Sequence, residues 1–296
     1  MPLIATLISH PARPAVSTDL ANRAAKAVSA SSDVRWLDQD VACEFDLPAD
    51  VAPADALATL RAAVAQAPVD VAVVDAAGRR KRVLLADMDS TMIDQECIDE
   101  LADVIGIKAH VAAITTRAMN GEIAFEPALR ERVTLLRDLD EAMIDKVIAE
   151  RITLASGGKA LVATMNAAGA TTALVSGGFE SFTSRVAEKL GFGEHRANRL
   201  LVENGRLSGL VQEPILGKEA KAIALREIAA REGVLPSDVL AVGDGANDLD
   251  MIRIAGMGVA LHAKPAVAAQ AGIRIDHGDL TALLYLQGYR RDEFAA

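Results

Sequence analysis

Three short clusters of polar residues have the composition needed to bind phosphate together with a metal ion. They are Asp87-Met-Asp89-Ser-Thr91, Ser176-Gly177-Gly178 and Gly243-Asp244-Gly245-Ala-Asn247-Asp248. Each follows an apolar run, at 83–86, 171–175 and 239–242. Runs of this kind predict parallel strands that are buried on both faces. Because ligands bind beyond the carboxyl ends of such strands, we expect the three clusters to line one cleft.

The cleft would hold four carboxylates, those of Asp87, Asp89, Asp244 and Asp248. In a medium of low dielectric constant they would suppress one another's ionisation unless a cation compensated them. Mg²⁺ is bound through oxygen, typically by one or two carboxylates together with water and a substrate phosphate. The acidic cluster therefore predicts a magnesium site.

Groups that can donate hydrogen bonds to phosphate oxygens lie in the second cluster and between the second and third clusters. Ser176 and the Gly177 amide belong to the second cluster, and Lys218 stands at the start of a predicted helix. Such groups form charge-assisted hydrogen bonds to phosphate. Together with the carboxylates they predict phosphoryl transfer, in which positioning and charge neutralisation supply most of the catalysis.

Each cluster by itself has a simpler interpretation. Asp-x-Asp after a strand is often a turn or a helix cap, and Ser-Gly-Gly is usually a turn. The third cluster alone also suits a calcium-binding loop, and a lone lysine such as Lys218 is usually a surface residue. The occurrence of all of them in this order, at the ends of predicted strands, favours catalysis.

The elements around the clusters predict an α/β fold with a doubly wound parallel sheet. Further strands are expected at 258–260 and 273–275, and helices at 159–168, 179–190, 218–232, 248–255 and 265–271. Residues 95–152, between the first two clusters, have helical periodicity throughout. Residues 203–208 predict a hairpin turn between short strands.

The N-terminal residues predict a separate α+β domain at 1–78. Strands are expected at 3–9, 34–37, 41–45 and 69–75, and helices at 18–30 and from Pro53 onward. This βαββαβ order is ferredoxin-like and resembles the ACT domain, which often binds amino acids. An interaction or dimerisation module is an equally open interpretation. The basic segment 76–82 marks the boundary, where a solvated linker is favoured over a nucleic-acid patch.

Composition excludes several other classes. The 296 residues carry a formal net charge of −10, which disfavours a general nucleic-acid binder. The two cysteines, Cys43 and Cys97, cannot form a disulfide framework. No apolar run approaches the roughly 20 residues of a membrane helix, and a secretory signal is not recognisable. We therefore expect a cytoplasmic protein with no membrane partner.

The clusters and Lys218 resemble the four motifs of the haloacid dehalogenase superfamily. The resemblance covers residues 79–296 and implies a HAD-like phosphatase domain with a helical cap at about 96–155, inserted after the first strand. Within the superfamily, Glu96, 119–121 and 125–136 are similar to the phosphoserine phosphatase family. The expected activity is hydrolysis of O-phospho-L-serine to L-serine and phosphate, the last step of serine biosynthesis.

The resemblance also implies roles for individual residues. Asp87 would be the nucleophile that forms an aspartyl-phosphate, and Asp89 the acid and then the base. Mg²⁺ would be held by Asp87, the Asp89 carbonyl and Asp244, with Asp248 orienting a metal-bound water or Lys218. Lys218, Ser176, Gly177 and Asn247 would bind the phosphoryl oxygens. In the cap, Glu96 would pair with the substrate ammonium, Arg132 with its carboxylate, and Met119 and Phe125 would form apolar walls.

Three alternatives remain open at this point. The phosphoryl group could pass to homoserine or another small hydroxyl acceptor, or the substrate could be a different small phosphomonoester. The protein could instead serve mainly as an amino-acid sensor through its N-terminal domain. A homodimer is also compatible with the sequence.

Overall fold

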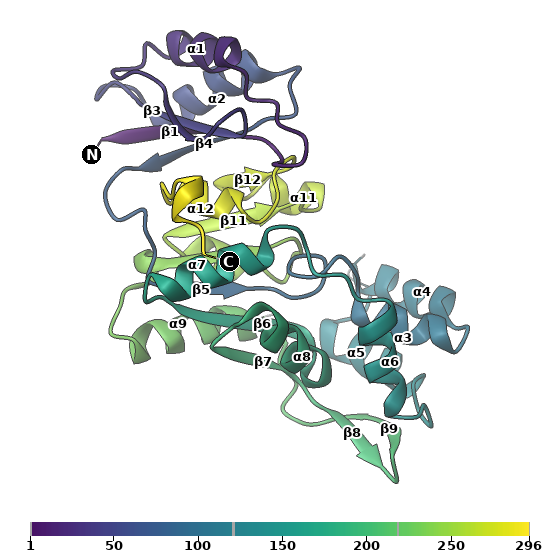
Figure 1. Ribbon diagram of the computed structural model, residues 1–296. Helices are drawn as coiled ribbons and strands as arrows, with labels where there is room; N and C mark the ends of the chain where they lie inside the picture. The colour runs from purple at the N-terminus through teal and green to yellow at the C-terminus, as the bar shows by residue number, and fades with distance from the viewer. Residues whose placement is uncertain (1, 120–121, 218, 296) are drawn as a thin grey trace.

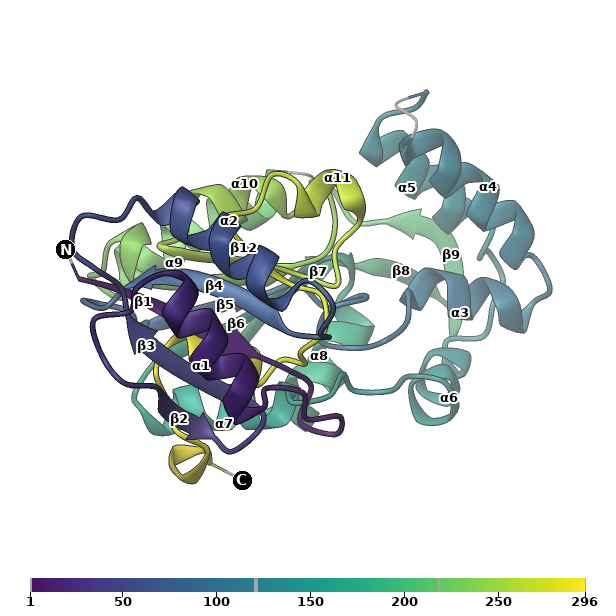
Figure 2. The same cartoon turned by 90° about the horizontal axis from the view of Figure 1, so that it is seen from above.

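The computed structural model describes residues 2–119, 122–217 and 219–295. An antiparallel N-terminal unit lies on top of a parallel α/β core, and a helical cap projects from the side of the core (Figure 1). The view from above shows the cap well away from the N-terminal unit (Figure 2). None of the described helices is long and apolar enough to cross a membrane.

The core is built around a six-stranded sheet with the order β12-β11-β10-β5-β6-β7, and every neighbouring pair is parallel. The strands are β5 (Val83–Ala86), β6 (Thr171–Phe179), β7 (Glu194–Asn198), β10 (Val239–Gly243), β11 (Met257–Leu261) and β12 (Ile273–Ile275). The connecting helices are α7 (Gly158–Ala167), α8 (Glu180–Leu190), α9 (Ala220–Arg231), α10 (Leu249–Ile254), α11 (Pro265–Ala268) and α12 (Ala282–Leu286). The core also contains the 3₁₀ turns η1 (Pro236–Asp238) and η2 (Arg291–Glu293). The predicted α/β parallel sheet is confirmed.

The strand order places the polar clusters at one edge of this sheet. β5 is central, and the chain runs outward from it through β6 and β7 before returning to β10 on its other side. Ala86 of β5 pairs with both Leu174 and Val242, so the residues that follow in all three strands lie level with one another. This is the point in an open α/β sheet where a ligand crevice forms.

Two element boundaries near the clusters differ from the sequence-based expectation. β6 continues through Ser176-Gly177-Gly178 to Phe179, where the strand was expected to end at Val175. The extra residues stay extended but are out of register with β7 between Val175 and Phe179. α9 begins at Ala220, two residues after the expected start at 218.

The cap is inserted between β5 and α7, as predicted. It comprises α3 (Cys97–Val104), α4 (Lys108–Met119), α5 (Phe125–Thr134) and α6 (Ala142–Glu150). The outgoing and returning linkers pair with each other, because Ile93 forms an antiparallel bridge with Leu154 and the Asp94 N–H donates to the Thr153 carbonyl. The cap therefore joins the core through a two-stranded stalk.

The predicted hairpin is also confirmed and packs against the cap. β8 (Leu200–Glu203) and β9 (Arg206–Val211) are joined through Asn204 and Gly205, whose φ angles are +53° and +76°. Positive φ at both turn residues suits the right-handed twist of a hairpin. The Asp138 N–H donates to the Leu207 carbonyl, which fixes the hairpin to the end of the cap.

The N-terminal unit is an antiparallel sheet with the order β2-β3-β1-β4 and the chain order βαββαβ. Its elements are β1 (Leu3–Ile8), α1 (Thr18–Ala27), β2 (Arg35–Asp38), β3 (Ala42–Asp46), α2 (Pro53–Val64) and β4 (Asp70–Asp75). Ala5 and Leu7 of β1 pack with α1 and α2, whereas Ile4 and Ile8 belong to the hydrophobic core of the parallel domain. Both faces of this sheet are therefore buried.

Polar contacts fasten the N-terminal unit to the core. The Asp70 carboxylate accepts hydrogen bonds from the backbone N–H groups of Asp276, His277 and Gly278 at 2.7–3.2 Å. The Tyr285 hydroxyl donates to Asp38 at 2.7 Å. These bonds satisfy polar groups that the hydrophobic contact would otherwise leave without partners.

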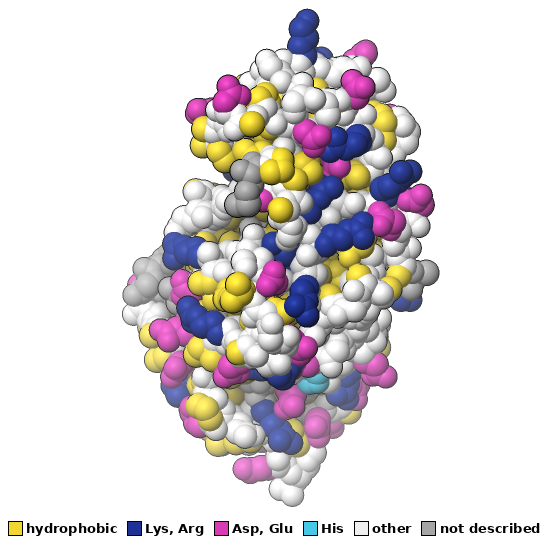
Figure 3. Space-filling view, turned by 90° about the vertical axis from the view of Figure 1, so that its left-hand side faces the viewer, with side chains coloured by type: hydrophobic (Ala, Val, Ile, Leu, Met, Phe, Trp, Pro, Cys, Tyr) yellow, Lys and Arg dark blue, Asp and Glu magenta, His cyan; other side chains and the backbone are white. Residues whose placement is uncertain are grey.

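The basic segment 76–82 is a bonded junction and not the freely solvated linker that was expected. Arg79 pairs with Glu44 at 2.6 Å, Arg80 lies over the Tyr289 ring at 4.0 Å, and the Lys81 ammonium donates to two backbone carbonyls. The face in Figure 3 shows Lys and Arg side chains interspersed with acidic ones where the N-terminal unit meets the core. The arrangement gives no support to a nucleic-acid patch.

We predict that Asp70→Ala lowers the free energy of unfolding by about 2 kcal/mol, because it leaves three backbone N–H groups at this junction without their acceptor. Asp75→Ala, at the exposed end of the same strand, should change it by less than about 0.5 kcal/mol. Denaturant titration of both variants measures the difference. Equal free energies for the two variants would contradict a docking role for Asp70.

Candidate active site

The floor of the site is a buried lysine between two aspartates. The Lys221 ammonium lies 2.7 Å from Asp87 Oδ1 and 2.5 Å from Asp248 Oδ1, and the three residues are 3%, 5% and 0% exposed. Asp87 follows β5, Lys221 is in the first turn of α9, and Asp248 precedes α10. Burial lowers the pKa of Lys221, but the carboxylates of Asp248 and Asp87 outweigh it, so the pKa lies above its ordinary value. Lys221 is therefore a permanent cation.

Asp248 also shapes the loop after β10. Its Oδ2 atom accepts the backbone N–H groups of Asp244 and Gly245 at 3.1 and 2.9 Å. A Cβ atom at Gly243 would lie 2.3 Å from the Asp248 carboxyl carbon, so no larger residue fits there. This close approach positions Asp244 beside Asp87.

The acidic residues carry more negative charge than their described partners neutralise. One carboxylate oxygen from each of Asp87, Asp244 and Asp248 lies within 4.8 Å of the others. Burial and then the neighbouring Asp248 raise the pKa of Asp87 well above its ordinary value, and the same causes raise the pKa of Asp244 to about 6. Among the residues that the structure describes, the partners of the Asp244 carboxylate are the Thr91 hydroxyl at 3.5 Å and the Lys264 ammonium at 3.9 Å. This donor set suits a hard divalent cation, which would reverse these pKa shifts.

Asp89, two residues after Asp87, lines the same cavity. Its Oδ1 atom accepts the Cys97 N–H at 3.1 Å. Burial raises the pKa of Asp89 to about 7, and the nearby Glu96 carboxylate adds to that effect. A Cβ at Gly178 would lie 2.9 Å from Asp89 Oδ2, so the glycine at the end of β6 leaves room for this carboxylate. A group of this kind can give and take a proton near neutral pH.

The extended end of β6 provides polar groups for a phosphate. Ser176 is 2% exposed, and its hydroxyl accepts the Gly178 N–H at 2.9 Å. Ser176, Gly177 and Gly178 line the same cavity as Asp87, Asp89 and Asp244, and Asn247 lines it from the loop after β10. Ser176, Gly177 and Asn247, which the sequence predicted as phosphate donors, therefore meet the carboxylates.

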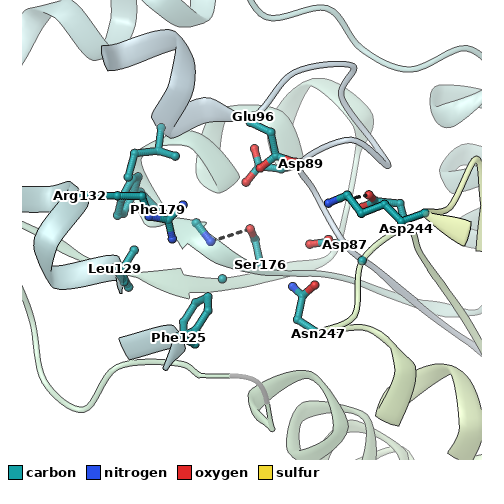
Figure 4. Close-up of a pocket in the computed structure, with 15 residues that line it drawn as sticks. Asp87, Asp89, Glu96, Phe125, Leu129, Arg132, Ser176, Phe179, Asp244 and Asn247 are labelled. Atoms are coloured by element: carbon teal, nitrogen blue, oxygen red, sulfur yellow. Dashed lines mark hydrogen bonds and ion pairs between the residues drawn. The ribbon is translucent and has the colours of Figure 1, made fainter. Parts of the chain in front are cut away.

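The cap closes the other end of a cavity of about 130 Å³. Figure 4 shows Asp87, Asp244 and Asn247 at one end and Arg132, Leu129 and Phe125 at the other, with Glu96 and Asp89 pointing in between them. The Arg132 guanidinium donates to the Ala128 carbonyl and the Thr115 hydroxyl, and no carboxylate in the described part of the chain lies within 4.0 Å of it. Burial lowers its pKa, which Asp99 and Glu96 partly offset.

The side chains of two predicted site residues are not described by the structure. Lys218 lies outside the described residues, as does the side chain of Met119. The other predicted residues converge on the site: Asp87, Asp89, Glu96, Phe125, Arg132, Ser176, Gly177, Asp244 and Asn247 line the cavity, and Asp248 lies beneath it.

Sequence analysis missed Lys221, Lys264 and Leu129. A signal for Lys221 was present, because it shares one helical face with Ala224, Leu225 and Ile228, all of which are buried. A lysine in an otherwise apolar stripe must find a carboxylate inside the fold. Lys264, which is half-exposed beside Asp244, and Leu129 gave no comparable signal.

The buried Asp87–Lys221 pair thus lies at the switch point of a parallel sheet, beneath a helical cap whose residues line the same cavity as Asp87. The family model of haloacid dehalogenase-like hydrolases matches residues 84–253. The chain belongs to this family.

Individual relatives extend the comparison. A phosphoserine phosphatase from Albidiferax ferrireducens is 46% identical over 210 residues, which are 69% of this chain and 89% of that protein. A HAD family hydrolase from Salmonella enterica subsp. enterica serovar Typhi has a TM-score of 0.86 at 27% identity, covering 96% of this chain and 98% of that one. A substrate-bound phosphoserine phosphatase complex has a TM-score of 0.65 at 40% identity, covering 69% and 97%.

We predict that Lys221→Gln lowers kcat at least about 100-fold, because it removes the cation that neutralises Asp87 and Asp248. Lys218→Gln should lower kcat less than about 10-fold, since Lys221 already occupies the buried position. Initial rates of phosphate release, measured below the melting temperature of each variant, compare the two. A larger loss for the Lys218 variant would show that the cation was assigned to the wrong lysine.

Proposed function

We propose that this protein is a magnesium-dependent phosphomonoesterase that hydrolyses O-phosphoserine to serine and phosphate. One observation carries the proposal: a small cavity joins Asp87, the partner of Lys221 in the core, to Glu96 and Arg132 of the cap. The identity to phosphoserine phosphatases supports the same substrate. The reaction would proceed through an aspartyl-phosphate at Asp87.

In the first half of the reaction, an Asp87 carboxylate oxygen attacks phosphorus and the bond from phosphorus to the serine oxygen breaks. Asp89 gives its proton to the departing oxygen, a role that suits a cavity-lining carboxyl group held by the Cys97 N–H. Lys221, Ser176, the Gly177 amide and Asn247 hold the phosphoryl oxygens and balance their charge.

In the second half, the Asp89 carboxylate takes a proton from a water molecule that attacks the phosphorus of the aspartyl-phosphate. The bond from phosphorus to Asp87 then breaks, which releases phosphate and restores the nucleophile. One carboxyl group can serve both halves because the first half leaves it in the basic form that the second half requires.

Asp87, Asp244 and the Asp89 carbonyl would hold Mg²⁺, with Asp248 keeping Lys221 and the Asp244 loop in place. When bound, the ion neutralises the carboxylates and the phosphate and so favours the approach of two anionic groups. The raised pKa values of Asp87 and Asp244 support the need for such a cation.

The cap would select the amino-acid end of the substrate. Glu96 would pair with the ammonium, and Arg132, which has no carboxylate partner among the described residues, would bind the carboxylate with two parallel hydrogen bonds. Phe125 and Leu129 supply apolar walls. The side chain of Met119 stays a prediction.

For the N-terminal unit we propose an ACT-like fold, supported by the strand order β2-β3-β1-β4. Amino-acid sensing by this unit, a homodimer and a cytoplasmic location stay predictions. Calorimetry of the full chain with serine tests the first, provided that an Arg132→Ala variant is used to silence binding in the active site.

A panel of phosphomonoesters tests the substrate. We predict that Arg132→Ala lowers kcat/KM for O-phosphoserine about 100-fold, the cost of losing a paired charge contact, and changes it less than about threefold for O-phosphoethanolamine, which lacks the carboxylate. Arg130→Ala, on the same helix but paired with Glu126 and Glu213 on the surface, is the matched control and should resemble the wild type.

An equal loss on both esters would refute recognition of the carboxylate by Arg132. Assays with added homoserine separate transfer from hydrolysis, because transfer releases less free phosphate than serine. A second ester turned over faster than phosphoserine by the wild type would displace phosphoserine as the substrate.

Metal removal gives an independent prediction. Chelation should lower phosphate release at least about 100-fold, and Mg²⁺ added in excess of the chelator should restore it, because the ion supplies several kcal/mol of charge stabilisation. The measurement is a rate with and without each addition. Full activity in chelator would exclude a metal-dependent reaction.

A further inference from the structure

Asn198, the last residue of β7, connects two segments that belong to different walls of the active site. Its side-chain amide donates to the Gly177 carbonyl at 2.9 Å, and its Oδ1 atom accepts the Leu216 N–H at 2.7 Å. The same amide group also reaches the Leu216 carbonyl at 3.4 Å. Asn198 is 2% exposed, so these bonds take the place of the hydrogen bonds that its polar atoms would otherwise form with water.

The first bond compensates for an irregularity in the sheet. β6 and β7 pair regularly as far as Val175 and Arg196, and pairing resumes only at Phe179 and Asn198. Residues 176–178 are out of register, so their carbonyl groups need partners other than the regular ladder. The Asn198 amide is that partner for Gly177, and it thereby fixes the orientation of a peptide in the phosphate-binding stretch.

The second bond reaches the opposite wall. Leu216 and Gly217 precede α9, the helix that carries Lys221. Leu216, Gly177, Ser176 and Lys221 all line one small cavity beneath the phosphate-binding region. The two bonds of Asn198 therefore span the space between the end of β6 and the chain leading to Lys221.

We propose that Asn198 is a positioning residue for phosphoryl binding. It holds the Gly177 peptide and the segment before α9 at the separation in which Ser176, the Gly177 amide and Lys221 contact the same phosphoryl group. The inference rests on the proposed phosphoryl transfer at Asp87. Asn198 itself contacts neither the substrate nor the reacting atoms.

The chemistry of the contact requires a side chain that both donates and accepts. An aspartate at this position could still accept the Leu216 N–H, but it could not donate to the Gly177 carbonyl. Its carboxylate would instead repel that carbonyl oxygen and move the peptide. Asn198→Asp is therefore a nearly isosteric change that removes the bond to the Gly177 carbonyl and the longer one to the Leu216 carbonyl, and keeps the bond from the Leu216 N–H.

A matched control exists at the junction of the two domains. Gln287 is fully buried, its Oε1 atom accepts the Lys81 N–H at 2.9 Å, and its amide donates to the Leu283 carbonyl at 3.0 Å. Gln287→Glu thus makes the same amide-to-carboxylate change at an equivalent pair of hydrogen bonds, one accepted and one donated, away from the catalytic cavity. It reports the effect of disturbing a buried amide that has no role in phosphoryl binding.

The experiment measures hydrolysis of p-nitrophenyl phosphate and its inhibition by inorganic phosphate, with melting temperatures for each variant. We expect Asn198→Asp to lower kcat/KM at least about 30-fold and to raise the inhibition constant of phosphate at least about 10-fold, on the scale of one lost hydrogen bond to a charged group. Gln287→Glu should change both constants less than about threefold, even where its melting temperature falls equally.

If Asn198→Asp does not fold, Asn198→Ala, which removes all three side-chain bonds without adding charge, takes its place with the same expectation. An unchanged inhibition constant for phosphate in the folded variant would overturn the proposal, as would equal losses in the Gln287 variant. Failure of the wild type on O-phosphoserine would refute the proposed substrate and leave this measurement unaffected, because it uses a different ester and free phosphate.

Discussion

The site depends on one buried ammonium group shared by two carboxylates. Lys221 lies between Asp87 and Asp248, and none of the three is more than 5% exposed. Taking such charges out of water is expensive unless they are paired closely, and removing one partner of a buried pair typically costs 3–5 kcal/mol. Because the three residues come from α9, the end of β5 and the start of α10, their pairing also fixes those elements relative to one another.

The remaining machinery is arranged around this pairing by close backbone approaches. Gly243 lets Asp248 reach the N–H groups of the loop after β10, and Gly178 leaves room for Asp89. The groups of the core that line the phosphate end of the cavity are thus fixed in position by hydrogen bonds within the protein. The cap contributes its residues through a two-stranded stalk, so recognition of the rest of the substrate is structurally separate from the phosphoryl chemistry.

The N-terminal unit contributes to the same framework from the other side of the core. Asp70 accepts hydrogen bonds from the backbone of residues 276–278, and the adjacent Asp279 accepts one from Ser156 at 2.6 Å. Ser156 lies where the returning stalk of the cap rejoins the core, directly before α7. A continuous set of hydrogen bonds therefore runs from β4 to the base of the cap.

Much of this architecture could be predicted from local patterns. Apolar runs followed by Asp87, Ser176 and Asp244 predicted three strand ends at one edge of a parallel sheet. The Asn204-Gly205 turn predicted a hairpin. Both features could be predicted because short-range sterics and burial dominate them. The extension of β6 through Ser176–Gly178 was missed, since the out-of-register Gly177 carbonyl has its partner in Asn198, 21 residues away in the sequence.

The identity of the buried cation shows most clearly which features the sequence sets and which the tertiary structure sets. The sequence by itself determined that several carboxylates in one cleft require a compensating cation, for which it predicted Mg²⁺. It also predicted that a lysine before the third cluster brings an ammonium group to the site. Only the tertiary structure decided that Lys221 supplies it, by packing the Ala224 and Ile228 face of α9 against the sheet and so directing that ammonium toward Asp87 and Asp248. Helix orientation depends on packing against strands distant in the chain, and no local pattern of charges specifies it.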